Sequence, residues 1–246
     1  MERKPIMAGN WKMYKTESEA LDFCLKIKPE ICQIQNRTVI ICPPTPALSK
    51  VWDVIKDCQI ALGGQNMHWE EEGAFTGEVS AAMLKSVGCS YVIIGHSERR
   101  QFFCETDVTV NKKLQAALKH NLSPIVCVGE TLDQREKNET FAVIKTQING
   151  AFQGIDAKHW DNIVIAYEPV WAIGTGKTAS PEQAQEVHAY IRSLLMPEVA
   201  QKTRILYGGS VKPDNVKELM AKPDIDGGLV GGASLKVESF LQLINY

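Results

Sequence analysis

The sequence predicts an α/β fold in which eight parallel strands, each followed by a helix, close into one barrel that spans residues 1–246. Short apolar runs alternate along the chain with longer stretches of helical period, and this happens eight times. Polar or glycine residues directly follow several of these apolar runs, including the first and the last. An open sheet gathers only the strands beside its switch point, whereas a barrel gathers every carboxyl end, so closure fits better.

The eight strand candidates are short and rich in β-branched residues. They lie at residues 6–10, 38–42, 60–64, 91–95, 124–129, 163–167, 204–209 and 225–232. Each run is almost continuously apolar instead of alternating. This pattern is typical of parallel strands that helices cover on one side and other side chains cover on the other.

The segments between these runs carry helix start signals. Thr16 and Glu19 form a capping box, and Ser180 and Gln183 form a second one with a proline at the first helical position. His188 falls on the apolar face of the second helix, so we interpret it as a core residue and not a ligand. No linker rich in proline, glycine or serine divides the chain, which indicates one domain.

Composition and charge exclude several classes of protein. The chain has 44% hydrophobic and 23% charged residues and a net charge of -2, and its basic residues are scattered, so we expect no nucleic-acid or membrane partner. No long apolar segment or signal peptide is visible, which favours the cytoplasm. The seven cysteines lack C-x-x-C spacing and are expected to be reduced thiols.

The segment 168–180 contains two misleading nucleotide motifs. A P-loop that ends in Gly176-Lys177-Thr178 needs a glycine where Trp171 stands, and a dinucleotide loop would have to follow its strand more closely. Pro169 holds Glu168 in an extended conformation at a strand end, and the glycines that follow permit a closing lid. Taken alone, the segment is equally compatible with a lid behind a positioned glutamate and with an ordinary surface loop.

The run 95–100, GHSERR, resembles a serine-hydrolase elbow but carries Arg99 where the second glycine belongs. The five histidines are far apart and show no metal-binding spacing, so no metal is expected. His96 stands just before a charged helix start, where the positive end of the helix favours a neutral imidazole.

The combination of a carboxylate, an imidazole, a lysine and glycine-rich loops suits one kind of chemistry. A carboxylate can remove a proton next to a carbonyl group while the imidazole and the lysine stabilise the enolate oxygen. Glycine-rich loops bind a phosphate. The reaction needs neither a metal nor an organic cofactor.

Five segments together resemble the triosephosphate isomerase family in order and spacing. They are Asn10-Trp11-Lys12, GHSERR at 95–100, AYEPVWAIGTGKTA at 166–179, YGGSV at 207–211 and LVGGASL at 229–235. The resemblance covers essentially the whole chain. It implies reversible isomerisation of D-glyceraldehyde 3-phosphate and dihydroxyacetone phosphate, in glycolysis and gluconeogenesis, through an enediolate.

The resemblance also implies a role for each matched residue. Glu168 is expected to be the base, His96 the neutral proton shuttle, and Lys12 and Asn10 the groups that polarise the substrate. Ser97 is expected to hold Glu168 before the lid closes, and Glu98 to pair with Lys12. The substrate is expected to meet Gly174, Ser210, Gly231 and Gly232 at its phosphate, and Ile173 and Leu229 over Glu168.

The loop at 65–79 is expected to form an interface. Met67, Trp69 and Phe75 look exposed in the sequence, and monomers seldom leave such apolar groups in water. By the resemblance, Thr76 reaches toward Asn10 and Lys12 of a second copy, which predicts a homodimer. Two alternatives remain: another phosphosugar barrel, such as a Schiff-base aldolase with Lys12 as its nucleophile, and a noncatalytic protein that binds a phosphorylated metabolite.

Overall fold

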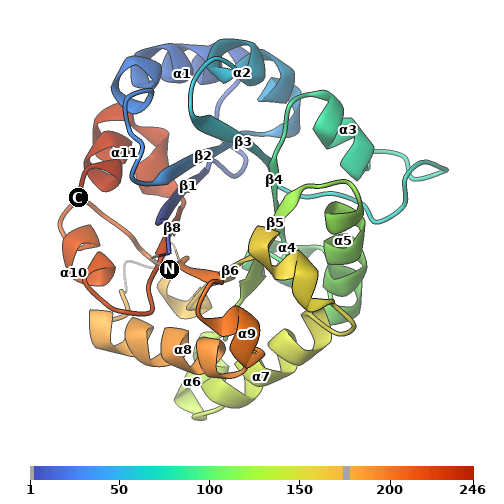
Figure 1. Ribbon diagram of the computed structural model, residues 1–246, viewed down its shortest axis with the longest axis vertical. Helices are drawn as coiled ribbons and strands as arrows, with labels where there is room; N and C mark the ends of the chain where they lie inside the picture. The colour runs from blue at the N-terminus through green and yellow to red at the C-terminus, as the bar shows by residue number, and fades with distance from the viewer. Residues whose placement is uncertain (1–2, 174–177) are drawn as a thin grey trace.

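Eight parallel strands, taken in chain order, form a closed barrel in the computed structural model, which describes residues 3–173 and 178–246 (Figure 1). The barrel closes where β8 pairs with β1, with Ile6 opposite Gly227. The strands are β1 (Ile6–Asn10), β2 (Thr38–Cys42), β3 (Ile60–Gly64), β4 (Tyr91–Ile94), β5 (Ser123–Val128), β6 (Val164–Tyr167), β7 (Arg204–Tyr207) and β8 (Gly227–Val230). The predicted α/β barrel is confirmed.

Helices surround the barrel on its outside (Figure 1). The α-helices are α1 (Glu17–Ile31), α2 (Leu48–Ile55), α3 (Ala81–Ser86), α4 (Ser97–Phe102), α5 (Asp107–Lys119), α6 (Leu132–Glu136), α7 (Thr140–Ala151), α8 (Pro181–Ser193), α9 (Pro197–Ala200), α10 (Val216–Met220) and α11 (Val237–Ile244). The 3-10 helices are η1 (Thr45–Ala47), η2 (Ala157–Asn162), η3 (Val170–Ala172) and η4 (Gly232–Leu235). Within the described ranges, no helix is long and apolar enough to cross a membrane.

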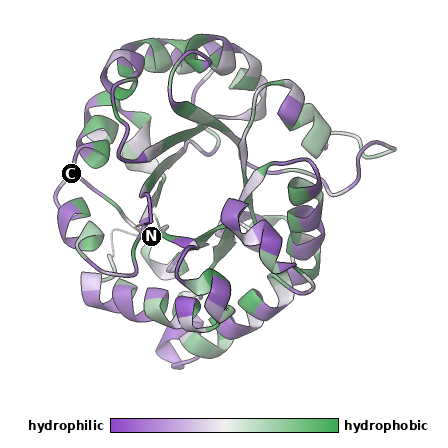
Figure 2. Cartoon of the chain, viewed as in Figure 1, coloured by the Kyte–Doolittle hydropathy of each residue, from purple (hydrophilic) through white to green (hydrophobic). Residues whose placement is uncertain are grey.

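Alternate residues of each strand belong to two separate cores. In β5, Ile125 and Cys127 pack inside the barrel, while Val126 and Val128 pack against the helices. Neighbouring side chains of a strand point to opposite faces, and here both faces are dry. The strands are therefore predominantly hydrophobic along their length, whereas the helices carry both hydrophobic and hydrophilic residues (Figure 2).

Both predicted helix starts are confirmed. The Thr16 hydroxyl and the Glu19 carboxylate complete a capping box at α1, and Ser180 and Gln183 do the same at α8. His188 is fully buried, and its Nδ1–H group donates to the main-chain oxygen of Asp224 over 3.2 Å. It is a core histidine, as the sequence indicated.

The eighth strand begins two residues later than its apolar run suggested. Asp226 precedes it, and the carboxylate of that residue accepts hydrogen bonds from Arg192 and from the Ile205 N–H group. Gly227 follows with a φ of 138°, and a Cβ atom there would lie 1.8 Å from the Ile6 oxygen. Only glycine permits the two strands to approach this closely.

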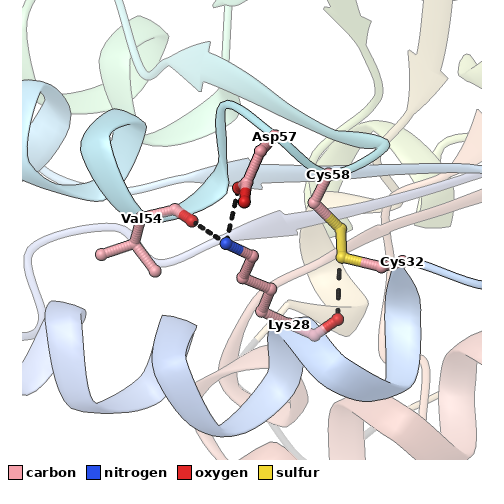
Figure 3. Close-up of a disulfide and its surroundings, with 5 residues drawn as sticks. All are labelled: Lys28, Cys32, Val54, Asp57 and Cys58. Carbon is pink, nitrogen blue, oxygen red and sulfur yellow. Dashed lines mark hydrogen bonds and ion pairs between the residues drawn. A yellow bond between two sulfur atoms is a disulfide. The ribbon is translucent and has the colours of Figure 1, made fainter.

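The expectation that all seven cysteines are reduced is wrong. Cys32 and Cys58 form a disulfide across 26 residues of sequence, with Cα atoms 5.1 Å apart (Figure 3). The bond joins the end of α1 to the turn after α2. Lys28 of α1 reinforces this junction because its Nζ donates to the Val54 oxygen and to Asp57, over 2.8 and 2.5 Å. The packing of the two helices creates the pairing, and the cysteine spacing alone does not reveal it.

The loop at 65–79 projects from the barrel between β3 and α3, at the right of Figure 1. Phe75 and Thr76 are exposed and Trp69 is half-buried. Met67, however, is 0% exposed and belongs to the main core, so its predicted exposure is wrong. It lies at the base of the loop, only three residues after β3, where the chain still faces the helix layer.

Candidate active site

The carboxyl ends of the strands surround a cavity of about 380 Å³. Nine of the residues predicted to form the site line it: Asn10, Lys12, His96, Glu168, Ile173, Ser210, Leu229, Gly231 and Gly232. Ser97 and Glu98 stand directly behind this wall, on α4. Thr76 lies away from the cavity at the exposed loop, and Gly174 lies outside the described residues.

Glu168 follows β6 and is held at one wall of the cavity by three hydrogen bonds. His96 Nε2 lies 2.8 Å from Oε1, the Ser97 N–H group donates to Oε2 over 2.9 Å, and the Ser97 hydroxyl donates to Oε1 over 3.3 Å. Burial raises the pKa of the carboxyl, since only 2% of the residue is exposed. The His96 charge and the hydrogen bonds outweigh burial, so the pKa lies below its ordinary value of 4.5.

His96 occupies the N-cap of α4, as expected from the run SERRQF. Its Nδ1 atom accepts the Glu98 N–H group over 3.3 Å, so Nε2 is the nitrogen that carries hydrogen in the neutral ring. Burial lowers the pKa of His96, but the negative charge of Glu168 raises it further, to above 6.5. The sequence predicted the opposite direction, because it did not place Glu168 beside the ring.

Lys12 stands at the turn after β1 with a φ of 52°. Its N–H group donates to Asn10 Oδ1 over 3.0 Å, and its main-chain oxygen accepts from Gln65 Nε2 over 2.8 Å. These two side chains hold the left-handed turn, which is uncommon for a residue that has a Cβ atom. Lys12 Nζ lies 2.5 Å from Glu98 Oε1, so the ammonium group is fixed at the cavity wall.

Part of the cavity lining, beside the Lys12 side chain, comes from the loops after β7 and β8. Ser210 follows β7, and Gly231 and Gly232 follow β8, with Gly232 at the start of η4. A Cβ atom on Gly232 would meet nothing within 4 Å, so this segment faces open space. Main-chain N–H groups at a helix start attract anions such as phosphate.

Sequence comparison identifies the family to which a chain with this site belongs. A family model described as "Triosephosphate isomerase" matches residues 5–246. The chain belongs to the triosephosphate isomerase family. It is accordingly an isomerase, and the predicted resemblance is confirmed.

Individual relatives of the triosephosphate isomerase family match over nearly their whole length. The triosephosphate isomerase of Alkaliphilus oremlandii is 58% identical and covers 99% of this chain and 100% of its own. That of Carboxydothermus hydrogenoformans is 56% identical, with 98% of each chain covered. The crystal structure of the Bartonella henselae triosephosphate isomerase has a TM-score of 0.91, with 41% identity and 98% of each chain covered.

The sequence did not single out two polar residues beside this triosephosphate isomerase site. Gln65 holds the Lys12 turn and also donates to the Cys42 oxygen over 2.9 Å. Glu130 follows β5, is fully buried, and accepts from the Tyr167 hydroxyl and the Trp171 indole N–H group over 3.1 and 2.9 Å. Burial raises the pKa of its carboxyl. Each follows a predicted strand, and this placement is the signal that could have identified them.

Proposed function

We propose that the chain interconverts D-glyceraldehyde 3-phosphate and dihydroxyacetone phosphate, as an enzyme of glycolysis and gluconeogenesis, with Glu168 as the catalytic base. One observation carries the proposal. Glu168, His96 and Lys12 line the same cavity of about 380 Å³, which Gly231 and Gly232 also line. A small phosphorylated molecule can therefore contact the base, the donors and the phosphate-binding amides at once.

Glu168 takes a proton from carbon one of dihydroxyacetone phosphate and returns it to carbon two. The electron pair of the broken C–H bond forms a double bond between carbons one and two, and the π pair of the carbonyl group moves to its oxygen, which gives an enediolate. Lys12 Nζ and the Asn10 amide stabilise the charge on this oxygen. His96 Nε2–H donates a proton to one oxygen, and the ring recovers a proton from the other. No atom is gained or lost, and the carboxylate, the imidazole and the lysine supply each proton transfer and the charge stabilisation, so we propose a reaction without a metal or organic cofactor.

The resting position of Glu168 is not its reacting position. Ser97 and His96 hold the carboxylate charged and lower its pKa. When substrate occupies the cavity, Glu168 turns from these donors toward carbon one, and its basicity rises as the hydrogen bonds are lost. Glu98 keeps the Lys12 ammonium beside the same substrate oxygen.

Proton transfer and charge stabilisation do not supply the whole rate enhancement. A positioned base contributes about 10²- to 10⁴-fold, and a preorganised donor contributes about 3 to 4 kcal/mol. Together they give about 6 to 10 kcal/mol, at the lower end of the enzymatic range of about 8 to 23 kcal/mol. Ile173 and Leu229 supply part of the remainder when they cover Glu168 and exclude water.

The phosphate binds at the wall formed by Ser210, Gly231 and Gly232, together with Gly174, which lies outside the described residues. The distance between this phosphate site and Glu168 determines which carbon atoms of the substrate reach the base. Binding energy from the phosphate therefore positions the reacting atoms.

The chain works as a homodimer, and residues 1–246 of each copy act as one domain. Thr76 is exposed at the tip of the projecting loop, beside Phe75, which is 43% exposed. A second hollow of about 360 Å³ lies next to Asn10 and Lys12 and includes the exposed Met13. The loop of one copy fills this hollow of the other, with Thr76 toward the partner's Asn10 and Lys12.

The proposed function also places the protein in the cytoplasm, where triose phosphates are interconverted. The decisive experiment is a coupled isomerase assay with each triose phosphate, with and without phosphoglycolate. Turnover in both directions and competitive inhibition are expected. Borohydride should trap no substrate on the chain, because Lys12 acts as a fixed cation and not as an imine-forming nucleophile. Absence of isomerisation, or covalent trapping at Lys12, would overturn the proposal.

A further inference from the structure

The main chain of Glu168 lies directly against the residues that follow β5. The Glu168 N–H group donates to the Val128 oxygen over 2.8 Å, and the Val170 N–H group donates to the Glu130 oxygen over 3.1 Å. Between them, a Cβ atom on Gly129 would lie 1.7 Å from the Glu168 oxygen. The position of the Glu168 main chain therefore depends on where the Gly129 peptide stands.

Gln147 holds this peptide from the outer ring of helices, where α7 lies (Figure 1). The Gly129 N–H group donates to Gln147 Oε1 over 2.7 Å, and Gln147 Nε2 donates to the Gly129 oxygen over 3.0 Å. One side-chain amide thus meets both polar groups of one residue. The contact spans 18 residues of sequence and joins α7 to the chain just beyond the end of β5.

The Gln147 amide fills the hydrogen-bonding position that a neighbouring strand would otherwise occupy. Consecutive residues of a strand direct their main-chain N–H and C=O groups to opposite neighbours. Those of Val128 face Glu168, so those of Gly129 face the other side of β5. On the other edge, β4 ends at Ile94, whose partner is Val126, so no strand remains beside Gly129. A primary amide has one donor face and one acceptor face, like a peptide, and can complete the ladder there.

We infer that Gln147 is a positioning residue for Glu168, acting through the Gly129 peptide. The inference rests on the proposed function, because it takes Glu168 to be the base. Gly129 and Gln147 both line a cavity of about 770 Å³ on the α4 side of Glu168, so this contact stands at the edge of a hollow. Loss of the amide lets Gly129 shift and moves the carboxylate relative to the substrate.

The test compares one variant with a matched control. Gln147→Met keeps the length of the side chain but removes both hydrogen bonds. Gln185→Met removes an equivalent pair elsewhere, in which Gln185 Nε2 donates to Asp224 Oδ2 over 2.6 Å and Oε1 accepts from the Asp224 N–H group over 3.1 Å. That pair lies before β8, at the end of the barrel opposite the cavity.

We expect Gln147→Met to lower kcat by about 10²-fold, the loss typical of a displacement near 1 Å. KM and the Kd of phosphoglycolate should stay within about twofold of wild type, since Ser210, Gly231 and Gly232 do not touch Gln147. Gln185→Met should keep the wild-type kcat. Wild-type kcat in folded Gln147→Met, or an equal fall in both variants, would overturn the inference.

Gln147→Glu gives an independent readout. An ionised carboxylate only accepts hydrogen bonds and repels the Gly129 oxygen, whereas a protonated carboxyl has one donor and one acceptor, like the amide. The kcat of Gln147→Glu relative to wild type should therefore rise as the pH falls from 8 to 5, and a constant ratio would contradict the inference. Glu168→Gln is measured alongside. Turnover by Glu168→Gln would refute the proposed base itself, whatever the Gln147 variants do.

Discussion

His96 Nε2 and Glu168 Oε1 lie 2.8 Å apart in the wall of the cavity, although their sequence positions belong to different strand ends. The contact pairs a buried imidazole with a buried carboxylate, and each raises the population of the other's charged form. The pair therefore holds the proposed base charged and hydrogen-bonded, and these bonds must break before the base reacts.

The pair stabilises the fold within a defined pH window. The pKa of Glu168 is lowered, so its contribution is present above pH 4.5 and is lost as the pH falls through the folded pKa. The pKa of His96 is raised, so its contribution is full below pH 6.5 and is lost as the pH rises through the folded pKa. Urea denaturation should show the largest difference in unfolding free energy between wild type and His96→Gln at pH 4.5–6.5. A difference independent of pH would contradict this account.

His188 makes the fold sensitive to acid. Burial lowers its pKa to about 3, whereas the unfolded chain takes up the proton near pH 6.5. The lowered pKa means that stability falls as the pH drops below 6.5 toward 3, by about 1.4 kcal/mol per pH unit for this group. His188→Gln should flatten the dependence of unfolding free energy on pH in that range. An unchanged slope would show that the ring is protonated in the folded chain.

The Cys32–Cys58 disulfide should stabilise the folded chain. A cross-link that closes a loop of 26 residues is expected to contribute about 3 to 4 kcal/mol by restricting the unfolded chain. Treatment with a thiol reductant should lower the Tm of wild type. Cys32→Ser/Cys58→Ser should show the lower Tm with or without reductant. Equal Tm values for oxidised wild type and the double variant would show that the disulfide does not stabilise the folded chain.

Phe75 on the projecting loop should be needed for dimerisation. Phe75→Glu places a charge at the proposed interface and should give a monomer with strongly reduced turnover. Leu25→Glu is the matched control, because Leu25 is 62% exposed and belongs to α1 instead of the loop. It should remain dimeric and active. Sedimentation at micromolar concentration distinguishes the two, and a fully active monomeric wild type would refute the dimer.

The barrel could be predicted because each strand appears in the sequence as a short run of consecutive apolar residues. Ile125 to Val128 must be apolar on both faces, and this requirement is visible in four consecutive residues. The site residues could be located because they follow strand ends, as Lys12 and Glu168 do. The capping box of Thr16 and Glu19 is local in the same sense.

Properties that depend on tertiary contacts could not be predicted. The direction of the His96 pKa shift requires Glu168 as a neighbour, and the disulfide requires α1 to pack on α2. Met67 looked exposed because it follows a strand within a polar loop, yet the base of the loop turns inward. The Gln147 contact joins one helix to the end of a strand, and no local pattern distinguishes it from a surface glutamine.

The most direct test of the account is Glu168→Gln, a change that keeps the size of the side chain and removes its ability to accept a proton as a base. Phosphoglycolate should bind with nearly the wild-type Kd, because the proposed phosphate site on Ser210, Gly231 and Gly232 is intact. The kcat for isomerisation should fall by about 10²- to 10⁴-fold or more. Near-normal turnover with normal inhibitor binding would contradict the assignment of Glu168 as the base.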